Sequence, residues 1–463
     1  MADYKIANIK WLRDQGWIIP DTYSDSVCPT YAEITSEIPK EGVSSVVVNS
    51  TCTATSVAYT SGNLVCEVDI TIILCYTPDI AIISEYVNQD KSINLNIGGV
   101  DTGLKALLVQ QDGSFVKIPT NGDNHLYGSE TYPYRNTTIF AYVGPTVTRL
   151  YSNDVGTGEW RSAFENFSNL EGVILADSVE YIAFGTFANC VKLKSLDFLN
   201  QVNDLGYSDF SGCTGLVGEI RVPDNVEDIG PKTFNDCTNI TKLTFGENSK
   251  LKYFHRNSNY ESIIKGCTSL TTIEFPKSLE NIGYYACTNA PNLTTVTFPA
   301  DSNLTEIDSN AFKGVTGIEY ITLPNSLTSL GEHVFEDCTG LKEITIPGSV
   351  EKINTWDFDG CTSLTSITIS NGVKTIGQMC LRGCTSLTSI SFPSSVTAIE
   401  YGALQNCSSL TSITVNRTTP PTLDQWTIPS SFSGTIYVPS GSVDTYKAAS
   451  QWSSFADKIQ AIP

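Results

Sequence analysis

The segment GCTSLTSITIS at residues 360–370 decides the fold, because it recurs twice more with small changes. GCTSLTSISFP follows at 383–393 and NCSSLTSITVN at 406–416, each 23 residues after the last. The leucine of this segment marks a phase that eleven residues hold: Leu170, Leu193, Leu216, Ile240, Leu270, Leu293, Ile318, Leu341, Leu364, Leu387 and Leu410. A fixed period of this length indicates a repeat architecture.

Each repeat has the apolar pattern of one short coil. Two apolar residues three and five positions after the leucine, such as Ile367 and Ile369, predict a strand with one buried face. A proline often follows, then a V-x-x-I piece, while a large apolar residue and a cysteine precede the leucine. One such coil cannot bury its own apolar face, but stacked coils form a continuous core. The sequence therefore predicts a mainly β solenoid of about eleven coils of ~23 residues, between 137 and 415.

The repeat pattern L-x-x-I-x-[IF]-P-x-S-[VL]-x-x-I-G-x-x-A-F-x-G-C-x-S resembles the BspA-like leucine-rich repeat over roughly 160–415. The tail at 416–463 resembles the end common on such proteins, with TIYVP as a strand and 440–449 as a helix that carries Val443 and Tyr446. Such a strand and helix would cap the solenoid. The resemblance implies binding and adhesion at bacterial or host surfaces, without catalysis.

Charge excludes several classes of partner. The chain of 463 residues has 49 acidic and 28 basic residues, a formal charge of −21. A field of this sign repels phosphate backbones and anionic lipid surfaces, so we expect neither nucleic-acid binding nor membrane insertion. The longest apolar run, IILCY at 72–76, is too short to span a bilayer. No secretory signal is visible at the first residues, so we expect synthesis in a cytoplasm.

Cysteines and histidines give no sign of a reactive centre. Eight of the 14 cysteines share one phase of the repeat and are expected to be buried as small apolar residues: Cys190, Cys213, Cys237, Cys267, Cys338, Cys361, Cys384 and Cys407. For Cys52, Cys66 and Cys75 both core thiols and a disulfide remain open. The three histidines lack metal-ligand neighbours, and no nucleophile or phosphate-loop motif occurs. We therefore expect no enzyme, no metal and no cofactor.

The first third of the chain does not repeat. Residues 1–40 are predicted to form a short helix and an arm that docks onto a larger assembly through an apolar stripe of Tyr4, Ile6, Ile9, Trp11, Leu12 and Trp17. Packing of that helix on its own domain is the alternative. Short apolar runs at close spacing predict a small β-sandwich over 41–136.

A second, shorter resemblance concerns location. VCPTYAEI at 27–34 resembles Cys-Pro-Thr stretches in virion proteins of crAss-like gut phages and in surface proteins of their hosts. It favours a head or tail fibre on a virion surface, attached to virion structural proteins by its N-terminus, homo-oligomeric, and meeting host-surface glycans or proteins through the solenoid. A bacterial cell-surface adhesin and a purely structural decoration protein are the alternatives.

Two surfaces are candidates for ligand binding. The longest repeat interval contains an insertion with Tyr253, Phe254, Arg256 and Tyr260, and exposed aromatic residues with arginine are typical binding anchors. Packing of this loop against the next coil is the alternative. The strand face contributes Glu319, Tyr320 and Lys342, and a ladder of hydroxyls that includes Thr365 and Thr388. Such hydroxyls also simply suit an exposed strand.

Overall fold

The computed structural model describes residues 104–112, 114–144, 146–154, 159–199, 201–255 and 261–463, and the backbone of three short strands between 46 and 66. The chain divides into two compact units, Met1–Gln201 and Val202–Pro463. The predicted N-terminal helix, with Tyr4, Ile6, Ile9, Trp11, Leu12 and Trp17, lies outside the described residues, as do Cys52 and Cys75.

The described part of the first unit consists of short strands and two single helical turns. They are β1 (Val46–Val48), β2 (Val57–Tyr59), β3 (Leu64–Cys66), β4 (Leu104–Gln110), β5 (Phe115–Pro119), β6 (His125–Tyr127), α5 (Gly128–Thr131), η1 (Tyr132–Tyr134), β7 (Thr138–Val143), β8 (Arg149–Tyr151), β9 (Asn153–Asp154), β10 (Trp160–Arg161), β11 (Gly172–Leu175) and β12 (Tyr181–Ile182). Strands β1, β2 and β3 form an antiparallel sheet.

The strands from β4 onward differ from the expected sandwich over 41–136. Strand β4 pairs antiparallel with β5 and β7, and β7 pairs parallel with β11. Strand β6 already pairs parallel with β8, which pairs parallel with β12. The parallel, coil-like pairing thus begins at His125, before the predicted boundary at 137. Apolar alternation in single strands could not reveal this, because it specifies the buried face and not the partner strand.

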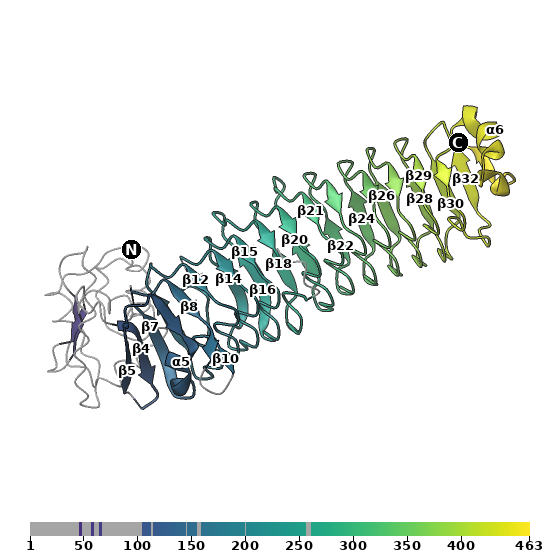
Figure 1. Cartoon of the computed structure of the whole chain (residues 1–463). Helices are drawn as coiled ribbons and strands as arrows, with labels where there is room; N and C mark the ends of the chain where they lie inside the picture. The colour runs from purple at the N-terminus through teal and green to yellow at the C-terminus, as the bar shows by residue number, and fades with distance from the viewer. Residues whose placement is uncertain are drawn as a thin grey trace, which may run out of the picture. The chain divides into compact units, whose positions relative to one another are not determined.

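The second unit is a stack of coils (Figure 1), and each coil supplies a strand to each of two ladders. The longer strands are β14 (Gly218–Val222), β16 (Ile240–Phe245), β18 (Thr272–Glu274), β20 (Thr295–Thr297), β22 (Tyr320–Thr322), β24 (Glu343–Ile346), β26 (Ser366–Ile369), β28 (Ser389–Phe392) and β30 (Ser412–Val415). The two-residue strands are β13 (Asp204–Leu205), β15 (Asp228–Ile229), β17 (Tyr253–Phe254), β19 (Asn281–Ile282), β21 (Glu306–Ile307), β23 (Ser329–Leu330), β25 (Lys352–Ile353), β27 (Thr375–Ile376), β29 (Ala398–Ile399) and β31 (Thr422–Leu423).

All strand pairs in these ladders are parallel, and they hold the register of the repeat except for an irregularity between Gly218 and Glu219, where β14 pairs with β16. Ile344 lies beside Ile367, and Ile390 beside Ile413. Strands β24, β26 and β28 alternate exposed and buried residues, as the L-x-x-I-x-I pattern predicts. Between the ladders a proline begins a turn, in which the carbonyl of Pro347, for example, accepts from the Val350 amide at 3.1 Å. The predicted mainly β leucine-rich repeat solenoid is confirmed, with about 14 turns where the leucine count predicted eleven.

The third side of each coil is built from consecutive tight turns. The residue four positions before the leucine has a positive φ in all eleven repeats, and it is always Gly, Asn or Asp: Asn166, Asn189, Gly212, Asp236, Gly266, Asn289, Gly314, Asp337, Gly360, Gly383 and Asn406. These are the residue types that adopt the left-handed region at low cost. In this conformation the Gly360 amide donates forward to the Arg382 carbonyl at 2.9 Å.

Phenylalanine and cysteine fill the space inside these turns. Phe335 stacks on Phe312 and Phe358, with ring centroids 5.6 and 5.4 Å apart. The Cys361 thiol donates to the Phe335 carbonyl at 3.1 Å, and the same bond recurs one coil on from Cys384 to Phe358 at 3.3 Å. The described repeat cysteines are buried free thiols, as expected. In both of these hydrogen bonds the acceptor is a backbone carbonyl of the preceding coil. The thiol is therefore a link between coils as well as an apolar filler.

The C-terminal cap follows the prediction for the tail. TIYVP forms β32 (Thr435–Val438), and the expected helix comprises η2 (Ser440–Ser442) and α6 (Val443–Ala448). Two further elements follow, η3 (Trp452–Phe455) and β33 (Ile459–Ala461), which pairs parallel with β32. Tyr446 is fully buried, and its hydroxyl donates to the Arg417 carbonyl at 2.7 Å. The cap thereby fastens to the loop that leaves the last repeat.

Candidate functional site

The outer face of the long strands is a regular polar surface in the second unit. Thr365, Ser366 and Thr368 are all exposed on one coil, and Thr388 occupies the place of Thr365 on the next. However, the Thr365 hydroxyl donates to the Lys342 carbonyl at 3.1 Å, and Thr411 donates likewise to Thr388. The hydroxyls next to the leucine therefore serve the stacking of coils. The side chains further along the strand, such as Thr368, form the outward surface.

Three predicted residues meet on this face. The Lys342 ammonium lies 2.7 Å from a Glu319 carboxylate oxygen and 5.9 Å from the centroid of the Tyr320 ring. Tyr320 is 58% exposed, so a flat aromatic surface remains open to solvent beside the ion pair. The hydrogen bond with Glu319 raises the pKa of Lys342, which stays charged. We call Glu319, Tyr320 and Lys342 the strand-face cluster.

The insertion is anchored more firmly than the sequence suggested. Phe254 is fully buried and packs edge-on against Phe275 at 5.0 Å, so its prediction as an exposed binding residue is wrong. Its position in the V-x-x-I phase of the coil explains the burial. Tyr253 is half-buried in β17, and Arg256 and Tyr260 lie outside the described residues.

The end of the insertion is tied to preceding coils. Glu261 accepts a hydrogen bond from the Tyr207 hydroxyl at 2.6 Å, and its other oxygen lies 2.6 Å from the Lys232 ammonium. These partners lower the pKa of Glu261, and Glu261 in turn raises the pKa of Lys232. This end of the loop therefore contacts the coils before it, whereas the alternative interpretation of the insertion was packing against the next coil.

Sequence reasoning missed a ridge of large side chains along the turn side of the coils. His333, Trp356 and Met379 occupy equivalent positions on successive coils, and all have positive φ. The rings of His333 and Trp356 are 4.7 Å apart between centroids, and the Trp356 indole nitrogen donates to the Met379 sulfur at 3.0 Å. Bulky residues rarely adopt this conformation. All three residues lie eight positions before the leucine of their repeat, and this shared position is visible in the sequence. Nothing in a single sequence indicates that the backbone there has a positive φ.

Two kinds of feature are absent from the described residues. Among them, no group of three His, Cys, Asp or Glu side chains is arranged to hold a metal ion. In the same part of the chain, none of the helices has the length and apolar character needed to cross a membrane. The second unit presents a regular strand face with a few local irregularities.

Comparison with known families matches a BspA type leucine-rich repeat region, in six copies, over residues 160–265, 258–355 and 305–427. The chain belongs to this family. Proteins of the family are generally non-enzymatic binding proteins and are typically found at bacterial cell surfaces. None of the curated proteins compared matches the chain.

Several solved structures match the chain at low identity. A leucine-rich repeat protein of Bacteroides ovatus is 21% identical over 79% of this chain and 100% of its own, with a TM-score of 0.39. A leucine-rich cell surface protein of Faecalibacterium prausnitzii is 22% identical over 65% of this chain and 84% of its own, with a TM-score of 0.35. A repeat protein of Eubacterium ventriosum is 19% identical over 66% of this chain and 93% of its own, with a TM-score of 0.36.

Proposed function

We propose that this chain is a non-enzymatic adhesion protein that is displayed on a bacterial surface and binds a glycan or protein through the strand face of its repeats. The strand-face cluster carries this proposal. Along a face of small hydroxyls, it combines an exposed aromatic ring with a fixed pair of opposite charges. Exposed aromatic side chains beside polar groups are the usual anchors of binding surfaces.

The surface that displays the protein is a separate part of the proposal. Family membership and the Faecalibacterium cell surface protein support a bacterial cell surface. The virion surface expected from the Cys-Pro-Thr stretch has no support among the comparisons. Immunogold labelling of producing cells and of phage particles from the same culture separates the two. Label on the cell envelope supports the proposal, and label confined to particles overturns its location.

A glycan array and an immobilised mucin layer test the binding surface. We expect the full chain to bind, and Tyr320→Ala to weaken binding about tenfold or more, which is typical for a central aromatic anchor. Thr328→Ala is the matched control, because its hydroxyl likewise bonds a carbonyl of the preceding coil, that of Thr305, but it lies beside the short strand β23 and not on the strand face. Equal binding by Tyr320→Ala and the unchanged chain would remove the cluster as the site. Absence of any binding partner would favour a structural decoration role.

Attachment and assembly are proposed from the sequence alone. The stripe of Tyr4, Ile6, Ile9, Trp11, Leu12 and Trp17 is proposed to dock onto a larger assembly, and the protein is proposed to form homo-oligomers. Deletion of residues 1–40 should release the protein from the surface that displays it, while its glycan binding is retained. A mass measurement by light scattering checks the oligomer, and a monomer at working concentration contradicts it.

A further inference from the structure

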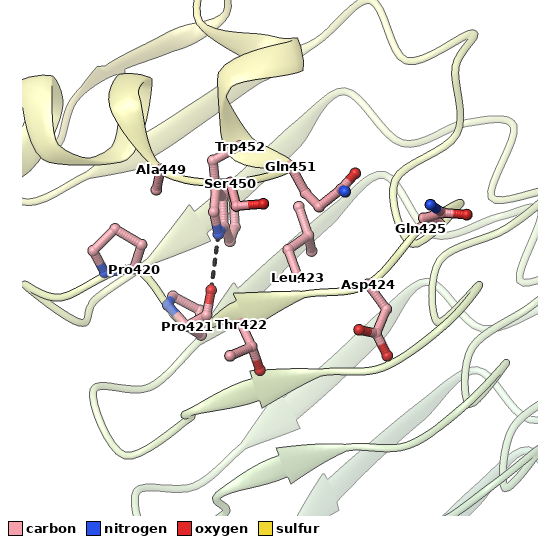
Figure 2. Close-up of a pocket in the computed structure, with 10 residues that line it drawn as sticks. All are labelled: Pro420, Pro421, Thr422, Leu423, Asp424, Gln425, Ala449, Ser450, Gln451 and Trp452. Atoms are coloured by element: carbon pink, nitrogen blue, oxygen red, sulfur yellow. Dashed lines mark hydrogen bonds between the residues drawn. The ribbon is translucent and has the colours of Figure 1, made fainter.

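A pocket of about 530 Å³ lies between the last two-residue strand, β31, and the loop that follows α6. Figure 2 shows its two walls, residues 420–425 from the solenoid and 449–452 from the cap. The walls are joined by the Trp452 indole, which is 1% exposed and donates to the Pro421 carbonyl at 2.9 Å. The Tyr446 ring packs edge-on against Trp452 at 5.2 Å. The pocket is therefore built on a rigid base.

Its floor contains a carbonyl that the stack of coils leaves open. In the coils of β25, β27 and β29, two carbonyls accept from amides of the next coil; those of Thr397 and Ile399 accept from Thr422 and Asp424. The equivalent carbonyls in β31 are those of Pro421 and Leu423. The Trp452 indole nitrogen donates to the Pro421 carbonyl. Within the described residues, no hydrogen bond reaches the Leu423 carbonyl, and Leu423 is one of the residues that line the pocket.

The cap wall has a backbone conformation that costs energy. Gln451 has φ 65 and ψ −38, and the Trp452 amide donates to the Ser450 carbonyl at 2.8 Å. This is a γ-turn with positive φ, a rare and strained form. Glycine is the default residue in such a place. A glutamine there, which lines the pocket (Figure 2), points to a use for the side chain.

The groups around the pocket select one class of ligand. The Leu423 carbonyl and the Asp424 carboxylate accept hydrogen bonds, while Gln425, Gln451 and the Ser450 hydroxyl donate and accept. No lysine or arginine lines the pocket, and Asp424 with the formal charge of −21 opposes an anion. Proline rings offer an apolar wall. A ligand with neighbouring hydroxyl groups on an apolar ring would complement these donors, acceptors and proline rings.

We propose that this pocket binds a neutral saccharide. Sugar hydroxyls donate to the Leu423 carbonyl and to Asp424, and they accept from the amides of Gln425 and Gln451. The site is distinct from the strand-face cluster, so it adds to the proposed adhesion role without depending on it. If Tyr320→Ala has no effect on binding but the pocket variants weaken sugar binding, the pocket proposal stands and the strand-face proposal fails. If only Tyr320→Ala weakens binding, the strand-face proposal stands and the pocket proposal fails.

Saturation-transfer NMR on the full chain tests the proposal, with glucose, galactose, mannose, N-acetylglucosamine, lactose and maltose as probes. We expect at least one of them to receive saturation. Asp424→Ala should weaken its binding about tenfold, as expected for loss of a charged hydrogen bond. Gln451→Gly should weaken it too, while the midpoint of unfolding stays equal or rises because glycine relieves the strained turn. Thr328→Ala is the control, because this exposed threonine lies beside the short strand β23, away from both the pocket and the strand face.

Several outcomes overturn the inference. One is no saturation of any of the six sugars. Another is saturation that both pocket variants leave unchanged. A third is binding of lysine amide in place of the sugars, which would assign the carboxylate and the open carbonyl to a cation. A Gln451→Gly chain that is less stable than the unchanged protein would show that the side chain supports the fold and is not kept for a ligand.

Discussion

Gly383 offers a clean test of the left-handed position that recurs in every repeat. Its φ is +74, and a Cβ added there would meet no atom closer than the Gly360 nitrogen at 3.6 Å. A side chain therefore fits, and only the backbone conformation opposes it. Gly360 is less suitable, because a Cβ there would approach the Asp337 carboxylate to 2.5 Å.

The expected magnitude follows from two opposing terms. Alanine in the left-handed region costs about 1–2 kcal/mol. Replacing glycine also reduces the freedom of the unfolded chain, which stabilises by about 0.4–1 kcal/mol. Gly383→Ala should therefore lower the free energy of unfolding by about 1 kcal/mol. Gly383→Asn should cost less, since asparagine tolerates this region and occupies the same place at Asn406.

Guanidinium unfolding followed by circular dichroism measures the effect. We expect a lower midpoint for Gly383→Ala at an unchanged slope, and a midpoint close to that of the unchanged protein for Gly383→Asn. Asn406→Ala and Asn406→Gly provide the reciprocal pair one coil on. Equal midpoints for Gly383→Ala and the unchanged chain would refute the requirement for a positive φ. A Gly383→Asn variant as unstable as Gly383→Ala would refute the explanation by residue type.

Three further outcomes are expected. Cys361→Ala should destabilise by about 1 kcal/mol in the same unfolding assay, because the buried Phe335 carbonyl loses one of its two hydrogen bonds and keeps only the one from the Cys338 amide; a neutral result would mean that the thiol only fills space. The ten described free thiols are buried, and burial raises the pKa of Cys338 to about 12, so they should react with a thiol reagent only on unfolding; fast reaction of more than four of the 14 in the native chain contradicts this. Burial raises the pKa of Asp357 to about 7, so the native state holds its proton more tightly than the unfolded state and stability is lost as pH rises from about 4 through 7. Asp357→Asn lacks this titration, and its stability relative to the unchanged chain should improve by up to about 4 kcal/mol over that range; a difference that does not vary with pH refutes the shift.

Much of the fold was predictable because each structural position of the coil occurs many times in the sequence. Nine leucines and two isoleucines in phase, followed by alternating apolar residues, specify both the buried face of Ile367 and its neighbour Ile344 one coil earlier. The N-terminal strands were harder, because β4 and β7 occur once each and their pairing depends on contacts remote in sequence. About three turns were missed, since a coil that lacks the leucine has no phase to count.

The candidate sites were predictable only in part. Glu319, Tyr320 and Lys342 were found as interruptions of a hydroxyl pattern, and the structure places them together. Phe254 was misassigned, because aromatic residues in an insertion resemble a loop although its phase belongs to the coil core. The pocket at β31 left no trace in the sequence. It arises where a ladder ends, and the open carbonyl of Leu423 belongs to the backbone rather than to any residue type.

The constant register of the second unit has a consequence for how such a chain changes over generations. Cys361 and Cys384 begin nearly identical stretches and make the same bond to the coil before. Removal of 361–383 would join equivalent points, so that the strand after the deletion inherits the partners of the one removed. Unequal recombination between the near-identical copies at 360–416 would therefore yield shorter or longer folded variants. The number of coils, and with it the length of the second unit, can therefore change between generations while the first coils of that unit and its C-terminal cap stay the same.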